Sequence, residues 1–160
     1  MKHNMDRIVD KIKEVCFSVN VKDRQGLHKE VIDKLKSVLI NEGYKVHLEY
    51  PIHFKSKIRK SGDKIIRDGN LDLVAVKGRD KIAVEFDNSV FLKFKSIEKL
   101  LQVEANLCIG LVRGKANTSE GSIKRIEQVK KEYAFLQKNF WLIIMKEKFS
   151  HKVGGAFFPA

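Results

Sequence analysis

Three carboxylates in the middle of the chain could together bind a metal ion. Glu85 and Asp87 stand two residues apart in the segment KIAVEFD, and side chains two apart on a strand point to the same face of a sheet. Asp72 lies near the start of the segment NLDLVAV, and the intervening segment KGRD contains the glycine typical of a hairpin turn. Counting back from that turn places Asp72 opposite the region of Glu85 and Asp87.

Carboxylates this close together repel each other unless a cation lies between them. A site built only from oxygen atoms suits Mg²⁺ or Mn²⁺, which bind one or two carboxylates together with water and a substrate phosphate. At a phosphodiester bond, such an ion neutralises the non-bridging oxygens and lowers the pKa of the attacking water. We therefore expect Asp72, Glu85 and Asp87 to hold Mg²⁺ or Mn²⁺. Each carboxylate also has an explanation without a metal. Glu85 could form a salt bridge with a basic neighbour, Asp72 could be a polar residue at the start of a strand after the DGN turn, and Asp87 could face solvent at the end of its strand.

The net charge points to a polyanionic partner. The 160 residues include 32 Lys and Arg against 20 Asp and Glu, a formal charge of +12, which favours nucleic acid first and an anionic membrane surface second. Residues 53–69 are especially basic and rich in turn formers, so we interpret them as a loop or extended arm that follows a nucleic-acid backbone. The cations of this basic arm are Lys55, Lys57, Arg59, Lys60, Lys64 and Arg67. An ordinary solvated loop is the alternative.

Hydrophobic periodicity predicts alternating helices and strands. Helices are expected at about residues 5–19, 27–40 and 97–106, the last with Ser96 as its N-cap, and within 119–137; strands are expected at residues 44–52, 70–76, 81–87, 107–114 and 140–146. The order is helix, helix, three strands in an antiparallel meander, helix, strand, helix, strand. It predicts a single α/β domain over residues 1–160 with a mixed central sheet flanked by helices. The tail after residue 150 receives no assignment.

Over about residues 27–112 this arrangement resembles the PD-(D/E)XK nuclease superfamily, also called the restriction-endonuclease-like fold. The resemblance implies an αβββαβ core, here extended by an N-terminal helix and a C-terminal helix and strand. Asp72 in GNLDLVAV matches the aspartate of the family's second motif, and Glu85 in IAVEFD matches the acidic residue of the third. Glu30 in HKEVIDKL stands where the family often has a helical glutamate that supports the metal site.

The third motif departs from the family pattern, because Asp87 stands where a lysine is usual. That lysine orients or activates the attacking water, and in some branches of the family it lies on the following helix. The segment FLKFKSIEKLLQ offers Lys93, Lys95 and Lys99 for this role, with Lys95 and Lys99 as the two leading candidates. Gln102, one turn further on, resembles a glutamine of several branches that could contact the site or the nucleic acid.

The resemblance implies a metal-dependent endonuclease that hydrolyses DNA, with RNA left open as a substrate, and that needs no small-molecule cofactor. A homodimer is expected, because a chain with one active centre must pair to cut both strands. The second hypothesis is a catalytically inactive nucleic-acid-binding module on the same fold, for which Asp87 is the direct reason. The third is a protein-interaction subunit with a basic surface and incidental carboxylates.

The remaining sequence features are those of an ordinary intracellular protein. Cys16 and Cys108 lie far apart within apolar runs, which predicts two buried thiols and no disulfide framework. No apolar run approaches the ~20 residues of a membrane span, and the segment MKHNMDRIVD lacks the apolar core of a signal peptide. We therefore expect a cytoplasmic protein with no membrane partner.

Overall fold

The computed structural model describes residues 2–21, 25–133 and 139–153, and within them it shows an α/β fold with one mixed sheet. The six strands lie in chain order across the sheet. They are β1 (Lys45–Lys57), β2 (Lys64–Lys77), β3 (Asp80–Asp87), β4 (Leu107–Val112), β5 (Asn139–Ile144) and β6 (Phe149–Val153). Pairing is antiparallel from β1 to β3, parallel from β3 to β5, and antiparallel between β5 and β6. The predicted fold class is confirmed at this level.

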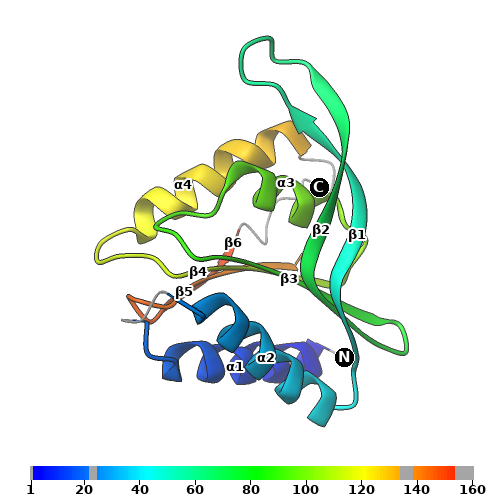
Figure 1. Ribbon diagram of the computed structural model, residues 1–160, viewed down its shortest axis with the longest axis vertical. Helices are drawn as coiled ribbons and strands as arrows, with labels where there is room; N and C mark the ends of the chain where they lie inside the picture. The colour runs from blue at the N-terminus through cyan, green and yellow to red at the C-terminus, as the bar shows by residue number, and fades with distance from the viewer. Residues whose placement is uncertain (1, 22–24, 134–138, 154–160) are drawn as a thin grey trace.

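Four helices cover the two faces of the sheet (Figure 1). They are α1 (Lys2–Ser18), α2 (Leu27–Asn41), α3 (Phe94–Gln102) and α4 (Ser119–Lys130), and a short 3₁₀ turn (Lys131–Tyr133) continues α4. The pair α1 and α2 lies on one face and the pair α3 and α4 on the other, and each pair closes its own hydrophobic core against the sheet. Strand β4 is buried along its whole length, as expected for a strand with helices on both faces.

Of the loop and the extended arm predicted for residues 53–69, the structure shows an extended arm over most of the range. The strands β1 and β2 pair in one register from Lys45 opposite Val76 to Lys57 opposite Lys64, interrupted at Glu49 and Asp72, and this hairpin projects well beyond the helices (Figure 1). Along the outer part of β1, Phe54 and Ser56 are buried and alternate with exposed neighbours, which is the pattern of a half-buried strand. The density of lysine and arginine conceals this alternation in the sequence. The basic arm is therefore the outer half of a β-hairpin.

Other element boundaries also differ from the predictions. Helix α3 begins at Phe94, with Lys93 as its N-cap, so the prediction of Ser96 as N-cap is wrong. The helix starts earlier because the carboxylate of Asp87 accepts a hydrogen bond from the backbone amide of Lys93 (2.8 Å). The segment left unassigned after residue 150 contributes most of β6, while residues 154–160 lie outside the described part. The fourth helix ends at Lys130, and residues 134–137 of its predicted range lie outside the described part.

Two smaller predictions can be checked. Cys16 and Cys108 are both buried, and neither forms a disulfide within the described residues; burial raises the pKa of the Cys16 thiol to about 12. Among the described residues, no helix combines the length and the apolar character that crossing a bilayer requires.

Candidate active site where strands β2 and β3 separate

Asp72 and Glu85 meet at the point where strands β2 and β3 stop pairing. The backbone register of the two strands runs from Lys77 opposite Asp80 to Leu73 opposite Val84. Immediately beyond it, the amide of Asp72 donates to Oε1 of Glu85 (3.0 Å), and the amide of Phe86 donates to Oδ2 of Asp72 (2.7 Å). The two carboxylates thus accept the hydrogen bonds that backbone carbonyl oxygens would accept if the strands stayed paired. The predicted position of Asp72 opposite Glu85 is confirmed.

Lys99 of helix α3 completes a charged cluster with these carboxylates. Its ammonium group forms an ion pair with Oε2 of Glu85 and donates to the carbonyl oxygen of Asn70 (2.8 Å). The lysine side chain is 14% exposed and the Glu85 side chain 5%, so the pair is largely removed from water. Of the two leading lysine candidates, Lys99 is therefore the one that the structure places in contact with a carboxylate. Lys95 lies one helical turn earlier, along the same helix, and lines the neighbouring cavities.

His28 reaches the site from helix α2, and the sequence reasoning missed it. Its Nε2 lies 3.1 Å from Oδ1 of Asp72, and its ring stacks on Phe86 with centroids 5.5 Å apart. In the sequence, His28 is one of five scattered histidines with no metal spacing. The available signal was its place in the first turn of the helix that was expected to support the site, two residues before Glu30. The resemblance points to Glu30 instead, because the family often has a glutamate on this helix.

The surroundings move the pKa values of the two carboxyl groups in opposite directions. Burial raises the pKa of Glu85 from 4.5 to about 7, the negative charge of Asp72 adds to the effect, and Lys99 opposes it. Burial also raises the pKa of Asp72, but hydrogen bonds from His28 and from the Phe86 amide outweigh it and leave that pKa below its ordinary value. The hydrogen bond to Asp72 in turn raises the pKa of His28. Asp72 is thus the member that ionises more readily, and Glu85 titrates near neutral pH.

Three other residues predicted for the site make different contacts. Glu30 is exposed on α2 and pairs with Lys34 (3.2 Å). Asp87 is buried and holds the amide of Lys93, as described above. The side-chain amide of Gln102 accepts from the backbone nitrogen of Lys55 and donates to the carbonyl oxygen of the same residue, both at 2.7 Å. Gln102 therefore satisfies the open edge of strand β1, whose outer side has no neighbouring strand.

The donor set at the site suits a divalent cation that keeps most of its water. In the described ranges, no group of three or more His, Cys, Asp or Glu side chains is arranged to hold a metal ion. Asp72 and Glu85 nevertheless supply the one or two carboxylates that Mg²⁺ takes from a protein, with water and phosphate as the other ligands. The ammonium group of Lys99, held by a carboxylate oxygen and the Asn70 carbonyl oxygen, shows that this place already favours a cation. Asp72 and Glu85 are thus the residues that would hold Mg²⁺ or Mn²⁺.

The cations of the basic arm fall into two groups. Lys57 and Lys64 both bind Glu132, at the end of the helical segment after α4, with nitrogen-to-oxygen distances of 3.1 and 3.7 Å. Arg59 and Arg67 line a cavity between the hairpin and helices α3 and α4. Lys55 and Lys60 are exposed. The first pair thus anchors the hairpin, and the other four remain available to a ligand.

Comparison with known proteins assigns no family. No family model matches the chain, and neither the curated proteins nor the solved structures contain a match.

Proposed function

We propose that this chain is a metal-dependent nuclease of the PD-(D/E)XK type. The observation that carries the proposal is the contact of Lys99 with Glu85, at the place where Asp72 meets the same carboxylate. A lysine beside the two carboxylates is the component that the sequence motif lacks, and helix α3 supplies it. The order α2, β1, β2, β3, α3, β4 supports an αβββαβ core of the restriction-endonuclease-like kind.

The chemistry assigned to the site is hydrolysis of a phosphodiester bond. A divalent ion held by Asp72 and Glu85 would neutralise phosphate oxygens and lower the pKa of a bound water. Lys99 can hydrogen-bond the attacking water and stabilise the negative charge that develops on the phosphate oxygens. His28 orients the carboxylate of Asp72 and helps to keep it ionised. The substrate is DNA, with RNA as an outcome to be tested, and a homodimer would allow both strands to be cut.

The alternative is a catalytically inactive nucleic-acid-binding module. It is favoured by the completeness of the contacts at the site, because Lys99 already neutralises Glu85 and Asp87 is engaged by the Lys93 amide. The two functions differ in what a metal does. A nuclease needs Mg²⁺ or Mn²⁺ for turnover, whereas a binding module keeps its affinity for nucleic acid when the metal is removed and cuts nothing.

The test is cleavage of supercoiled plasmid, linear duplex and single-stranded DNA and RNA in Mg²⁺, Mn²⁺ or EDTA. The informative variant is Glu85→Gln, which keeps the size of the side chain and removes its charge. Asp33→Asn is the matched control, since this exposed α2 residue pairs only with Lys29 in the described contacts. We expect metal-dependent cutting by the wild type and the control, and a loss of at least about 100-fold in Glu85→Gln. Undiminished cutting by Glu85→Gln would refute the site, and tight binding without cutting by the wild type would refute the nuclease.

A further inference from the structure

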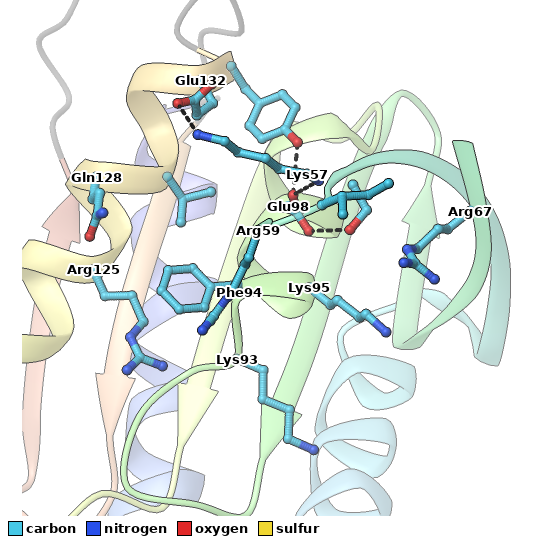
Figure 2. A pocket seen from close by; sticks show the side chains of 14 residues that line it. Lys57, Arg59, Arg67, Lys93, Phe94, Lys95, Glu98, Arg125, Gln128 and Glu132 are labelled. Carbon is cyan, nitrogen blue, oxygen red and sulfur yellow. Dashed lines mark hydrogen bonds and ion pairs between the residues drawn. The ribbon is translucent and has the colours of Figure 1, made fainter. Parts of the chain in front are cut away.

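A cavity of about 750 Å³ lies between the projecting hairpin and helices α3 and α4, and cationic side chains point toward it from three sides (Figure 2). The hairpin contributes Lys57, Arg59 and Arg67, the start of α3 contributes Lys93 and Lys95, and α4 contributes Arg125. The walls also carry two carboxylates, Glu98 and Glu132. The charge that the cavity offers to a ligand depends on whether these carboxylates neutralise the cations.

Both carboxylates are engaged in holding the hairpin. Glu98 is buried and accepts hydrogen bonds from the Ser56 hydroxyl, the Lys57 amide and the Tyr133 hydroxyl, each at 2.9 Å. Glu132 binds the Lys57 ammonium group (Figure 2). These contacts connect the hairpin to α3 and to the turn after α4, and they leave the other cations of the cavity unneutralised.

Five cations of the cavity form no ion pair with a carboxylate of the described residues: Arg59, Arg67, Lys93, Lys95 and Arg125. Phe94 orders two of them, because the guanidinium carbons of Arg59 and Arg125 lie 4.3 and 4.6 Å from the centre of its ring. Stacking uses the flat face of a guanidinium and leaves N–H groups at its edge for a phosphate. Nε of Arg67 is buried and has no hydrogen-bond partner within the described structure. The five cations give this wall an excess of positive charge, which favours an anionic ligand.

A second hollow of about 380 Å³ adjoins the cavity on the side of Lys99. The two share Arg67 and Lys95, and the second is also lined by Lys99, whose ammonium group contacts Glu85. Lys95 and Lys99 are four residues apart on α3, a rise of ~6 Å along the helix axis. Lys99, Lys95 and Arg67 therefore lie between the proposed reaction centre and the larger cavity, where a sugar-phosphate backbone could follow them. The carboxylate of Asp68, which also lines the second hollow, is bound to His53.

We propose that the cavity receives a single-stranded extension of the nucleic-acid substrate, so that the substrate class is a duplex with a single-stranded end. This inference rests on the nuclease function proposed for the adjoining site. The cavity volume lies in the range that encloses one small ligand, and a duplex, whose major groove alone is ~12 Å wide, is too large for it. Single strands bind through cations that track the backbone. Ile66, 72% exposed on the wall of the second hollow, offers an apolar contact to the last base pair before the strands separate.

Binding without metal tests the inference separately from catalysis. Fluorescence anisotropy in EDTA compares a blunt duplex with the same duplex carrying a short 5′ or 3′ single-stranded extension. The variants are Arg59→Gln and Lys95→Gln. Lys95 was chosen because its side chain forms no hydrogen bond or ion pair within the described structure, so its replacement should leave the fold intact. Lys124→Gln is the matched control. It removes the same charge from Lys124, an exposed residue next to Arg125 whose ammonium group pairs with Glu120 outside the cavity lining. Unfolding midpoints of all proteins verify that they are folded.

We expect the wild type and Lys124→Gln to bind one of the extended duplexes about tenfold more tightly than the blunt duplex, and both cavity variants to lose most of this preference. The slope of log K against log salt should fall by about 0.7 for each phosphate contact removed from the single strand. Equal binding of blunt and extended duplexes would overturn the inference, as would an equal loss in Lys124→Gln. Displacement of the extended duplex by ATP at equal molar concentration would also overturn it, because the cavity would then be a site for free nucleotides.

Cleavage with the same duplexes distinguishes failure of the inference from failure of the proposed function. Metal-dependent cutting that is equally fast for blunt and extended duplexes refutes the cavity assignment and leaves the nuclease intact. Preferential binding of extended duplexes without cutting in any metal refutes the nuclease and supports the cavity as a site for single strands. Cutting that is faster on an extended duplex, and that loses this advantage in Lys95→Gln, supports both.

Discussion

The pH dependence of stability should change when Glu85 is replaced by glutamine. The pKa of Glu85 rises from 4.5 to about 7 on folding without metal, first because the group is buried and then because Asp72 lies beside it. For an acid whose pKa is raised in the folded state, ionisation opposes folding. The unfolded chain loses its proton first, so the folded state loses stability as the pH rises from about 4.5 toward 7, and the loss is complete above the folded pKa.

The magnitude follows from the change in pKa. Each pKa unit corresponds to about 1.4 kcal/mol, so a rise from 4.5 to about 7 costs the wild type about 3 kcal/mol of unfolding free energy between pH 4.5 and pH 8. Glutamine cannot ionise, so Glu85→Gln should escape this cost. Its other titrating groups, including His28, are shared with the wild type. The difference between the two pH profiles therefore reports mainly Glu85, together with the smaller effects of its removal on the pKa values of His28 and Asp72.

The measurement is urea unfolding in EDTA at pH 5 and pH 8 for the wild type, Glu85→Gln and Asp33→Asn. We expect the wild type and Asp33→Asn to lose about 3 kcal/mol more than Glu85→Gln between the two pH values. Absolute stabilities of the variant depend on how Lys99 adapts to the amide, which is why the comparison uses the change with pH. Parallel profiles for the wild type and Glu85→Gln would refute the assignment of a neutral-range pKa to this carboxyl group.

The site and the hairpin give three further predictions. At pH 8, Mg²⁺ or Mn²⁺ at 100 times its dissociation constant should stabilise the wild type by about 3 kcal/mol, seen as a higher unfolding temperature in a thermal scan, and should leave that of Glu85→Gln unchanged; an equal rise in both would place the metal elsewhere. Lys99→Met should lower kcat about 100-fold or more with a smaller change in KM, whereas unchanged kcat in steady-state cleavage would remove Lys99 from the reaction. Glu98→Ala leaves the Ser56 hydroxyl, the Lys57 amide and the Tyr133 hydroxyl without their acceptor; it should cost about 2–4 kcal/mol in urea unfolding, and a cost below 1 kcal/mol would contradict the anchoring of the hairpin.

The sequence was informative where the relevant contacts are local. The meeting of Asp72 and Glu85 could be counted from the turn between them, because antiparallel register across a short hairpin is fixed by the turn. His28 joins the same site across 44 residues of chain, and no periodicity records which residue of a helix will face a particular strand. The outer hairpin was missed for a related reason: Phe54 and Ser56 are buried by helix α3, a partner that comes about 40 residues later.

Helix α3 connects the proposed reaction centre with the proposed single-strand cavity. Lys95, Glu98, Lys99 and Gln102 recur at spacings of three and four, which places them along one face of the helix. From that face Lys99 contacts Glu85, Glu98 and Gln102 bind the backbone of β1, and Lys95 lines both hollows. A small displacement of α3 would thus disturb the carboxylates and the hairpin together.

Asp87 determines where this helix begins, because its carboxylate holds the amide of Lys93. In the proposed nuclease, the residue that stands in place of the third-motif lysine therefore positions the helix that presents Lys99 to Glu85. Under this proposal the roles of Asp87 and Lys99 depend on each other. An aspartate at the end of β3 is compatible with catalysis because the lysine comes from α3, the helix whose start that aspartate holds. Restoring the usual motif with Asp87→Lys would remove the acceptor at the start of α3 and add a second cation near Lys99. We expect that variant to be less active than the wild type in the plasmid assay, and higher activity would show that the two positions are interchangeable.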